Sequence, residues 1–201
     1  MNKEVILVGY SGHAYVAAEA LLASGMKLAG YLEKHALAYN PFDIAYLGFE
    51  EDDEVLQKLI NYEFFPSIGS NNIRAKVCSK LLKAGKTFAN AVHPAANVST
   101  YAVLGSGILI CRGSNINPFA SIGNGVIINT GAIIEHECMI ADFAHIAPGA
   151  VMAGNVSVGA YSFIGANAVI KEGVKVGSNV IVGAGAVVLN DVPDNQIVVG
   201  N

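Results

Sequence analysis

The chain has 201 residues, of which 53% are hydrophobic and only 14% are charged, and its net charge is −4. The acidic balance argues against nucleic acid or an anionic membrane surface as the main partner. No apolar run reaches the roughly 18 residues that a membrane span requires, so we expect no membrane insertion. The three cysteines (Cys78, Cys111 and Cys138) have neither paired nor metal-type spacing, which predicts reduced thiols and a cytoplasmic protein.

Residues 1–91 are predicted to form an α/β domain with a small parallel, Rossmann-like sheet. Apolar runs at 5–8, 28–32 and 64–68 are typical of buried strands. Helix-like segments follow each of them: one over residues 16–22, one opened by the acidic stretch 50–54, and one after Asn72. Alternating strands and helices indicate a parallel sheet with helical crossovers.

The last of these helices carries four basic residues, and we expect all four on its solvent-exposed side: Arg74, Lys76, Lys80 and Lys83. Nine of the 12 basic residues of the chain precede residue 90. This shift in composition predicts a domain boundary between residues 91 and 92.

Two glycine-containing turns follow strands of the predicted sheet, at residues 9–13 and 69–71. In an open parallel sheet, ligands bind beyond the carboxyl ends of the strands, and a turn that opens a helix presents free N–H groups to a phosphate. The first turn lacks the third glycine of the dinucleotide fingerprint, so tight structural turns are an alternative interpretation. Glu33 ends the second strand, where its carboxylate could bind a ribose or a base.

From Val92 to Val188, every sixth residue is aliphatic or Met, without exception over seventeen positions. Four residues after each of them comes a small or β-branched side chain, and glycine or alanine often follows. This period predicts that residues 92–201 form an all-β left-handed parallel β-helix with a little over five coils. An ordinary sandwich of strands would require turn signals at irregular spacing.

His136 lies between Glu135 and Glu137 at outward positions of the repeat, and His145 follows nine residues later. A neighbouring carboxylate stabilises imidazolium and makes histidine a stronger base, which suits proton abstraction from an amine or a hydroxyl that attacks an acyl group. A zinc site needs a third ligand, and His93 is more than two coils away, so we expect no metal. Asn129 is a candidate polar residue of the same region.

These residues carry a family resemblance. The chain resembles the hexapeptide-repeat acetyltransferases of bacterial surface-glycan pathways: the UDP-4-amino-sugar N-acetyltransferases that make bacillosamine-type sugars, and their sialic acid O-acetyltransferase relatives. The matching segments are 9–13, 69–74, 129–130, 134–138 and 154–156.

The resemblance implies a homotrimer with a UDP-amino sugar held by the α/β domain and acetyl-CoA held between adjacent β-helices. It implies that His136 is the general base and that Glu137 raises its basicity. The residues implied to contact acetyl-CoA are His145, Gly165, Ala166, Gly183 and Ala184. The residues implied to contact the UDP-sugar are Ser11, Gly12, His13, Glu33, Lys34, Gly69 and Asn129.

The expected reaction is acetyl transfer from acetyl-CoA to the 4-amino group of a UDP-linked 4-amino-dideoxy-N-acetylhexosamine. Glu33–Lys34 stands where the family often has an acidic pair, and Tyr10 replaces a smaller residue. One alternative is O-acetylation of sialic acid or a related sugar. Another, of a different class, is a non-catalytic scaffold that binds a nucleotide sugar. Cys138 occupies a small inward position, so we assign it to packing and not to acyl transfer.

Overall fold

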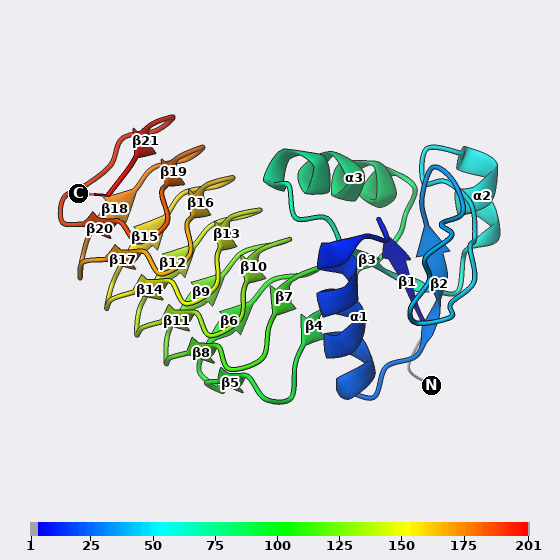
Figure 1. The fold of residues 1–201 in the computed structure, drawn as a ribbon, viewed down its shortest axis with the longest axis horizontal. Coiled ribbons are helices and arrows are strands. Elements are labelled where there is room, and N and C mark those ends of the chain that lie inside the picture. Colours follow the sequence, from blue (N-terminus) through cyan, green and yellow to red (C-terminus); the bar gives the residue numbers. More distant parts are fainter. Residues whose placement is uncertain (1–3, 201) are drawn as a thin grey trace.

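The computed structural model describes residues 4–200 as an α/β domain and a long solenoid (Figure 1). The helices of the described residues all belong to the α/β domain. This domain lies at the end of the solenoid where the coils begin, and α3 extends over the side of the coils.

The sheet of the α/β domain has three parallel strands in the order β2–β1–β3. These strands are β1 (Val5–Val8), β2 (Leu28–Leu32) and β3 (Glu63–Pro66). All four residues of β1 are buried, as expected for a central strand that is apolar along its whole length. The predicted parallel sheet is therefore confirmed.

Three helices follow the three strands: α1 (Gly12–Ala23), α2 (Asp53–Lys58) and α3 (Asn71–Lys83). α1 and α3 begin directly after the two glycine-containing turns. α2 begins within the acidic stretch because the Asp52 side chain accepts hydrogen bonds from the backbone N–H groups of Glu54 and Val55. The strand ends and the helix starts thus meet at one edge of the sheet.

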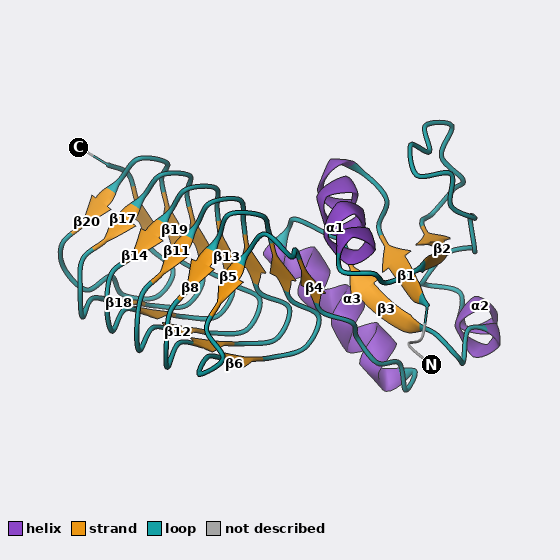
Figure 2. Cartoon of the chain, turned by 90° about the horizontal axis from the view of Figure 1, so that it is seen from below, coloured by secondary structure: helices purple, strands orange, loops and turns teal. Residues whose placement is uncertain are grey.

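The solenoid is built from two-residue strands in three parallel sheets, which we call faces 1, 2 and 3 (Figure 2). Face 1 comprises β4 (Ala91–Val92), β7 (Leu109–Ile110), β10 (Ile127–Ile128), β13 (His145–Ile146), β16 (Phe163–Ile164), β19 (Ile181–Val182) and β21 (Ile197–Val198). Face 2 comprises β5 (Asn97–Val98), β8 (Asn115–Ile116), β11 (Ile133–Ile134), β14 (Val151–Met152), β17 (Val169–Ile170) and β20 (Val187–Val188). Face 3 comprises β6 (Val103–Leu104), β9 (Ser121–Ile122), β12 (Met139–Ile140), β15 (Ser157–Val158) and β18 (Lys175–Val176).

Each strand from β4 to β17 pairs with the strand 18 residues further on, for example Ile127 with His145, so one coil is three hexads. The last coil is shorter, and Ile181 of β19 pairs with Ile197 of β21, 16 residues further on. The second residue of each strand points inward, and the six-step positions form one continuous buried core. The left-handed β-helix predicted from the period is confirmed. It has about six coils, because the sheets contain seven, six and five strands at three strands per coil, and the expected count of a little over five was low.

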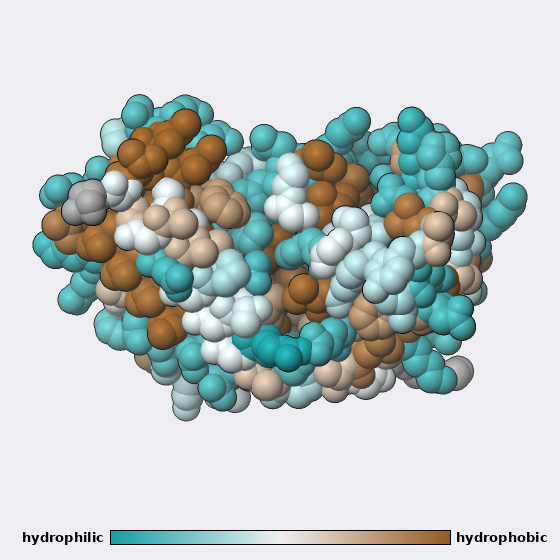
Figure 3. Space-filling model, in the orientation of Figure 1, coloured by the Kyte–Doolittle hydropathy of each residue, from teal (hydrophilic) through white to brown (hydrophobic). Residues whose placement is uncertain are grey.

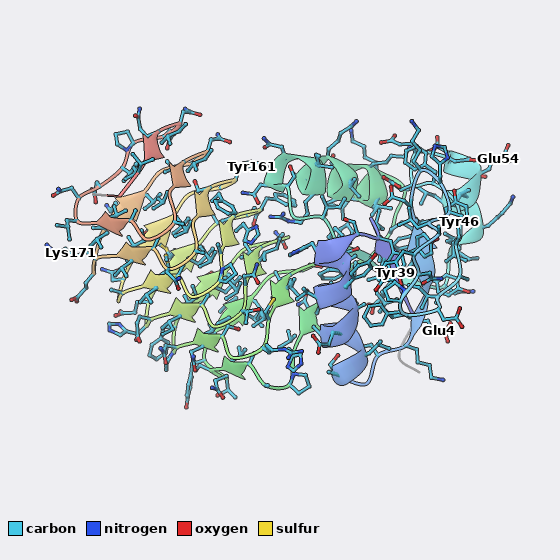
Figure 4. The ribbon with its side chains drawn as sticks, viewed as in Figure 1. Glu4, Tyr39, Tyr46, Glu54, Tyr161 and Lys171 are labelled. Carbon is cyan, nitrogen blue, oxygen red and sulfur yellow. The ribbon has the colours of Figure 1, made fainter. Side chains whose placement is uncertain are left out.

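The α/β domain packs on face 1 of the first coils. The outward residues Leu109 and Ile127 are buried in one cluster with Ala14 and Ala17 of α1. The N-terminal end of α3 lies on the edge between faces 3 and 1, where the side-chain amide of Asn71 donates hydrogen bonds to the backbone oxygens of Tyr161 and Ser162 (Figure 4). The two parts of the chain are therefore joined along one side of the prism.

Candidate active site

His136 lies on the edge between faces 2 and 3, and its side chain is 53% exposed. Its Nδ1 is 3.1 Å from Oε2 of Glu137. When Nδ1 carries the proton, its N–H group donates a hydrogen bond to this carboxylate. Nε2 then has a free lone pair on the outward side of the coil and can act as a base. The outward position and the neighbouring carboxylate, both expected from the sequence, are confirmed.

The imidazole of His136 rests on Gly154, which occupies the equivalent position one coil further on. A Cβ atom at Gly154 would lie 2.6 Å from both Cε1 and Nε2 of His136. Glycine is therefore required for this ring position. Although the sequence places His136 between two carboxylates, the hydrogen bond in the structure is to Glu137 alone among the described residues, and Glu135 makes no such contact.

His145 projects from face 1 and is only 8% exposed, because the α/β domain covers it. Its Nε2 is 3.2 Å from the side-chain nitrogen of Asn129. Since the side-chain oxygen of Asn129 already accepts the N–H of Thr130, its nitrogen donates to Nε2. The proton of neutral His145 is therefore on Nδ1, which is buried without a hydrogen-bond partner among residues 4–200.

His13 brings the first turn of α1 next to this histidine. The rings of His13 and His145 have centroids 6.0 Å apart, and a Cβ atom at Gly69 would lie 3.8 Å from the ring of His13. Burial, together with the positive charge of Arg74, lowers the pKa of both histidines to about 4. The structure thus brings His13, Gly69, Asn129 and His145 together as a neutral cluster at the junction of the two domains.

The two glycine-containing turns are tied to each other by Ser67. Its buried hydroxyl donates to the backbone oxygens of Val8 and Gly9, at 3.0 Å and 2.6 Å. Ser11 precedes α1 and makes no side-chain capping bond, so its hydroxyl and the first N–H groups of the helix are open to a ligand. This is the geometry of an anion site at a helix N-terminus.

Glu33 lies beside the first turn. Its carboxylate accepts hydrogen bonds from the backbone N–H groups of Tyr10 and Lys34, both at 3.1 Å. The end of β2 and the first turn are therefore joined by a hydrogen bond, and Lys34 is exposed next to them. Because its carboxylate is fixed by these two bonds, Glu33 presents acceptors that suit a ribose hydroxyl better than a phosphate.

The expected acetyl-CoA residues other than His145 lie along the edge between faces 1 and 2. Gly165 and Ala166 follow β16, and Gly183 and Ala184 follow β19 one coil further on. Gly165 also has a packing reason to be glycine, since a Cβ atom there would lie 2.5 Å from the backbone nitrogen of Ala184. These residues form one stripe along the solenoid, further from the α/β domain than His145.

The two histidines expected at the site do not lie together within one chain. His136 is on the edge between faces 2 and 3, which is opposite face 1, and His145 is on face 1. The inward residues of all three faces fill the space between them. Among residues 4–200, no group of three His, Cys, Asp or Glu side chains could hold a metal ion.

The sequence analysis gave no role to two residues that have a part in this arrangement. Gly154 was named only within the matching segment 154–156, although its place one 18-residue coil after His136 could have indicated the contact. Arg74 was expected on the exposed side of α3, but it is 1% exposed and that expectation is wrong. Its partners come from the turn before α3 and from two coils, and the sequence holds no local signal for such contacts.

A left-handed β-helix of hexads with an outward His–Glu pair defines a hexapeptide-repeat transferase. Two family models match the sequence: the PglD N-terminal domain over residues 4–81, and the bacterial transferase hexapeptide (six repeats) over residues 155–190. Within residues 4–200, no helix is long and apolar enough to cross a membrane.

Solved structures match over nearly the whole chain. Perosamine N-acetyltransferase from Caulobacter crescentus, solved with CoA and GDP-perosamine as a variant of one histidine, is 35% identical with a TM-score of 0.93, and the match covers 98% of this chain and 93% of that chain. The acetyltransferase domain of PglB from Neisseria gonorrhoeae FA1090, solved with acetyl coenzyme A, is 30% identical with a TM-score of 0.93 and coverage of 100% and 98%. The chain belongs to the family of hexapeptide-repeat sugar N-acetyltransferases.

A curated relative is the UDP-N-acetylbacillosamine N-acetyltransferase of Bacillus subtilis (strain 168). It is 34% identical over 110 residues, which are 54% of this chain. The matched stretch spans about half (51%) of that protein.

Proposed function

We propose that this protein transfers the acetyl group of acetyl-CoA to the 4-amino group of a UDP-linked 4-amino-dideoxy-N-acetylhexosamine, in the synthesis of a bacterial surface glycan. The observation that carries the proposal is the exposed His136–Glu137 pair, fixed over Gly154 on an otherwise regular coil. One relative matched over nearly its full length is named a perosamine N-acetyltransferase and was solved with CoA and GDP-perosamine. Another is named an acetyltransferase domain and was solved with acetyl coenzyme A.

In this mechanism the acceptor amine binds as an ammonium ion and gives one proton to Nε2 of His136. The free amine attacks the thioester carbonyl carbon, and the C–N bond forms as the C–S bond breaks. The second proton on the nitrogen goes to the departing thiolate, and His136 returns its proton to solvent. The products are the amide, the CoA thiol and one proton. Glu137 holds the imidazole in the required tautomer.

The proposed nucleotide-sugar site comprises the two glycine-containing turns and the end of β2, with Ser11, Gly12, Glu33 and Gly69. The free N–H groups at the start of α1 suit the diphosphate. Lys34 follows Glu33 at the surface, and His13 and Asn129 lie at the junction of the two domains. This assignment rests on the open start of α1, on the hydrogen bond from Tyr10 to Glu33, and on the resemblance stated from the sequence.

The active protein is proposed to be a homotrimer. His136 and His145 lie on opposite sides of one prism, so a site that contains both needs a second chain. A shallow apolar groove of about 420 Å³ runs along face 3 toward the edge between faces 3 and 1, lined by Ser121, Met139 and Ser157. Large apolar side chains are exposed on the coils (Figure 3), including Met139, Val169, Ile181 and Val187. Closed symmetric association would bury such surfaces.

A thiol-release assay tests the proposed reaction. Purified protein receives acetyl-CoA with UDP-linked amino sugars, GDP-linked amino sugars or sialic acid as the acceptor. We expect release only with a nucleotide-linked amino sugar, and UDP-linked acceptors to be preferred. Release with sialic acid alone would favour O-acetylation, and no release with any acceptor would favour the non-catalytic scaffold. Mass measurement in solution should give a species of three chains, and a fully active monomer would overturn the two-chain site.

The proposed location is the cytoplasm. Both co-substrates are small activated metabolites of that compartment. The three cysteines are free and buried, and burial raises the pKa of each thiol, which leaves them unreactive in a reducing environment.

A further inference from the structure

Arg74 is the largest fully buried side chain among the described residues, and its guanidinium group joins three parts of the molecule. Its Nε donates to the backbone oxygen of Gly125 at 2.7 Å, and its terminal nitrogen donates to the backbone oxygen of Phe143 at 2.9 Å. These two acceptors lie in successive coils, on the edge between faces 3 and 1.

The remaining N–H groups of Arg74 face the turn before α3. They donate to the backbone oxygens of Ile68 and Gly69, at 2.9 Å and 3.1 Å, and to the side-chain oxygen of Asn71 at 2.9 Å. The turn that carries Gly69 is therefore fixed to the coils through one planar group. A guanidinium group can hold this many acceptors at fixed angles, whereas an ammonium group cannot.

Among residues 4–200, Arg74 forms no ion pair with a carboxylate. The titratable groups that face it are His13 from α1, His145 from β13 and Cys78 from its own helix. Burying a charge without a counter-ion is costly, even with full hydrogen bonding, and an apolar residue of similar size would often pack at less cost. Stability alone therefore does not account for a guanidinium group at this place.

We propose that Arg74 is a positioning residue of acetyl transfer: it fixes the Gly69 turn, which forms part of the nucleotide-sugar site, to the coils at the junction that contains His13 and His145. The proposal rests on the proposed function. Without Arg74, the turn and the coils can shift relative to each other, so the nucleotide sugar binds more weakly and is presented less accurately. Of the residues expected to contact acetyl-CoA, only His145 lies at this junction, and the other four lie further along the solenoid. Acetyl-CoA binding is therefore less affected than nucleotide binding.

The test compares Arg74→Lys, which keeps the charge, and Arg74→Met, which removes it, with Lys76→Met as the control on the same helix. The Lys76 side chain is 80% exposed and lies away from the turn. Asn71→Ala is a milder variant that removes one acceptor of Arg74, together with the hydrogen bonds that Asn71 donates to the backbone oxygens of Tyr161 and Ser162, and it is expected to fold. Binding of UDP, GDP and acetyl-CoA is measured by calorimetry on folded protein, and KM and kcat are measured with the acceptor that the wild type uses.

For Arg74→Lys we expect nucleotide binding to weaken at least tenfold, the acceptor KM to rise in parallel, and the acetyl-CoA affinity to stay within twofold. Arg74→Met should bind nucleotide no more tightly than Arg74→Lys. Asn71→Ala should weaken nucleotide binding by a smaller factor, and Lys76→Met should match the wild type in nucleotide affinity and KM. A purely structural role would lower the thermal midpoint of the variants while folded molecules kept normal nucleotide affinity and KM.

Normal nucleotide affinity and KM in Arg74→Lys and Asn71→Ala would overturn the positioning role and leave the proposed function intact. Equal weakening of acetyl-CoA and nucleotide binding would also overturn it, since the effect would then not be confined to the turn. A wild-type protein that binds neither UDP nor GDP would instead overturn the proposed function, and the role of Arg74 with it.

Discussion

The ring of His136 is held by two neighbours of different kinds. Glu137 binds its Nδ1, and Gly154 supplies a flat surface beneath the ring. Glu137 itself has φ +61, in the left-handed region, as does Phe119 one coil earlier with φ +66. The same left-handed conformation recurs every six residues along the solenoid, for example at Gly131 and Phe143, so it is a regular feature of the coil corners. The orientation of the base is therefore a property of the coil edge as much as of the histidine.

Replacing His136, Glu137 and Glu135 one at a time should lower kcat in a fixed rank order. We expect His136→Ala to lower kcat by roughly 10²–10⁴-fold, the usual worth of a positioned base. Glu137→Ala should lower kcat by a smaller factor, because it removes only the group that orients the ring. Glu135→Ala is the matched control and should leave kcat nearly unchanged. Steady-state kinetics check this order, and equal losses from Glu135→Ala and Glu137→Ala would contradict it.

Replacing Gly154 with alanine should displace the His136 ring, because the added methyl group lies directly against it. Gly154 does not have a positive φ, so alanine is compatible with its backbone, but its Cβ atom would meet the imidazole at 2.6 Å. The ring must then move away from its present position. We expect Gly154→Ala to lower kcat at least tenfold with a thermal midpoint within a few degrees of the wild type. Unchanged kcat would show that the base works from a different rotamer.

At the scale of an element, the aromatic residues at the coil corners lie in two different environments, beside α3 or exposed. Phe143 and Tyr161 have φ +59 and +62, and their rings stack on each other at 5.6 Å beside α3. Phe119 has the same conformation, but it is 67% exposed, and its ring lies beside that of Tyr101 at a centroid distance of 5.8 Å. The backbone oxygens of Phe143 and Tyr161 accept hydrogen bonds from Arg74 and Asn71 of α3, and no such bond reaches Phe119 from the described residues.

Phe119→Asn should therefore raise the free energy of unfolding of the ligand-free protein by about 0.5–1 kcal/mol, because asparagine tolerates the left-handed conformation at lower cost. Asn155 occupies the equivalent corner one coil beyond Glu137 with φ +58. Phe143→Asn is the control and should lower the stability, since it removes a ring that packs over Gly125. Denaturant titration measures both. A loss of stability in Phe119→Asn would show that something covers this ring in solution.

At the scale of the whole molecule, the junction of the two domains is sensitive to pH. Because the pKa values of His13 and His145 are lowered to about 4, the unfolded chain binds more protons than the folded one between about pH 6.5 and pH 4. Stability should therefore fall as the pH drops through this window, by about 2 kcal/mol for each histidine at pH 5. Denaturant titration at pH 7 and pH 5 measures this fall in the free energy of unfolding. In His145→Asn the difference between the two pH values should be smaller. An equal pH dependence in that variant would contradict the prediction.

The sequence predicted most of the fold because its signals are periodic. The hexads determined the solenoid, and buried apolar runs determined the sheet. It also indicated His136 and Glu137, since polar side chains stand out on a regular coil. The burial of His145, the contact between His13 and His145, and the role of Arg74 could not be predicted. They depend on how the α/β domain packs on face 1, and contacts between residues 51 to 132 positions apart leave no local pattern.

The packing of α1 and α3 on the first coils has a consequence for the order of folding. In a solenoid each coil contacts only its neighbours, so the first coil has the least support unless something else stabilises it. Here the α/β domain supplies that support, because Ala91, Leu109 and Ile127 belong to its hydrophobic cluster. Folding can then propagate from this end, each completed coil serving as the template for the next. Opening by thermal fluctuation should proceed in reverse, from β21 inward, so slow amide exchange is expected beside α1 and faster exchange toward Ile197.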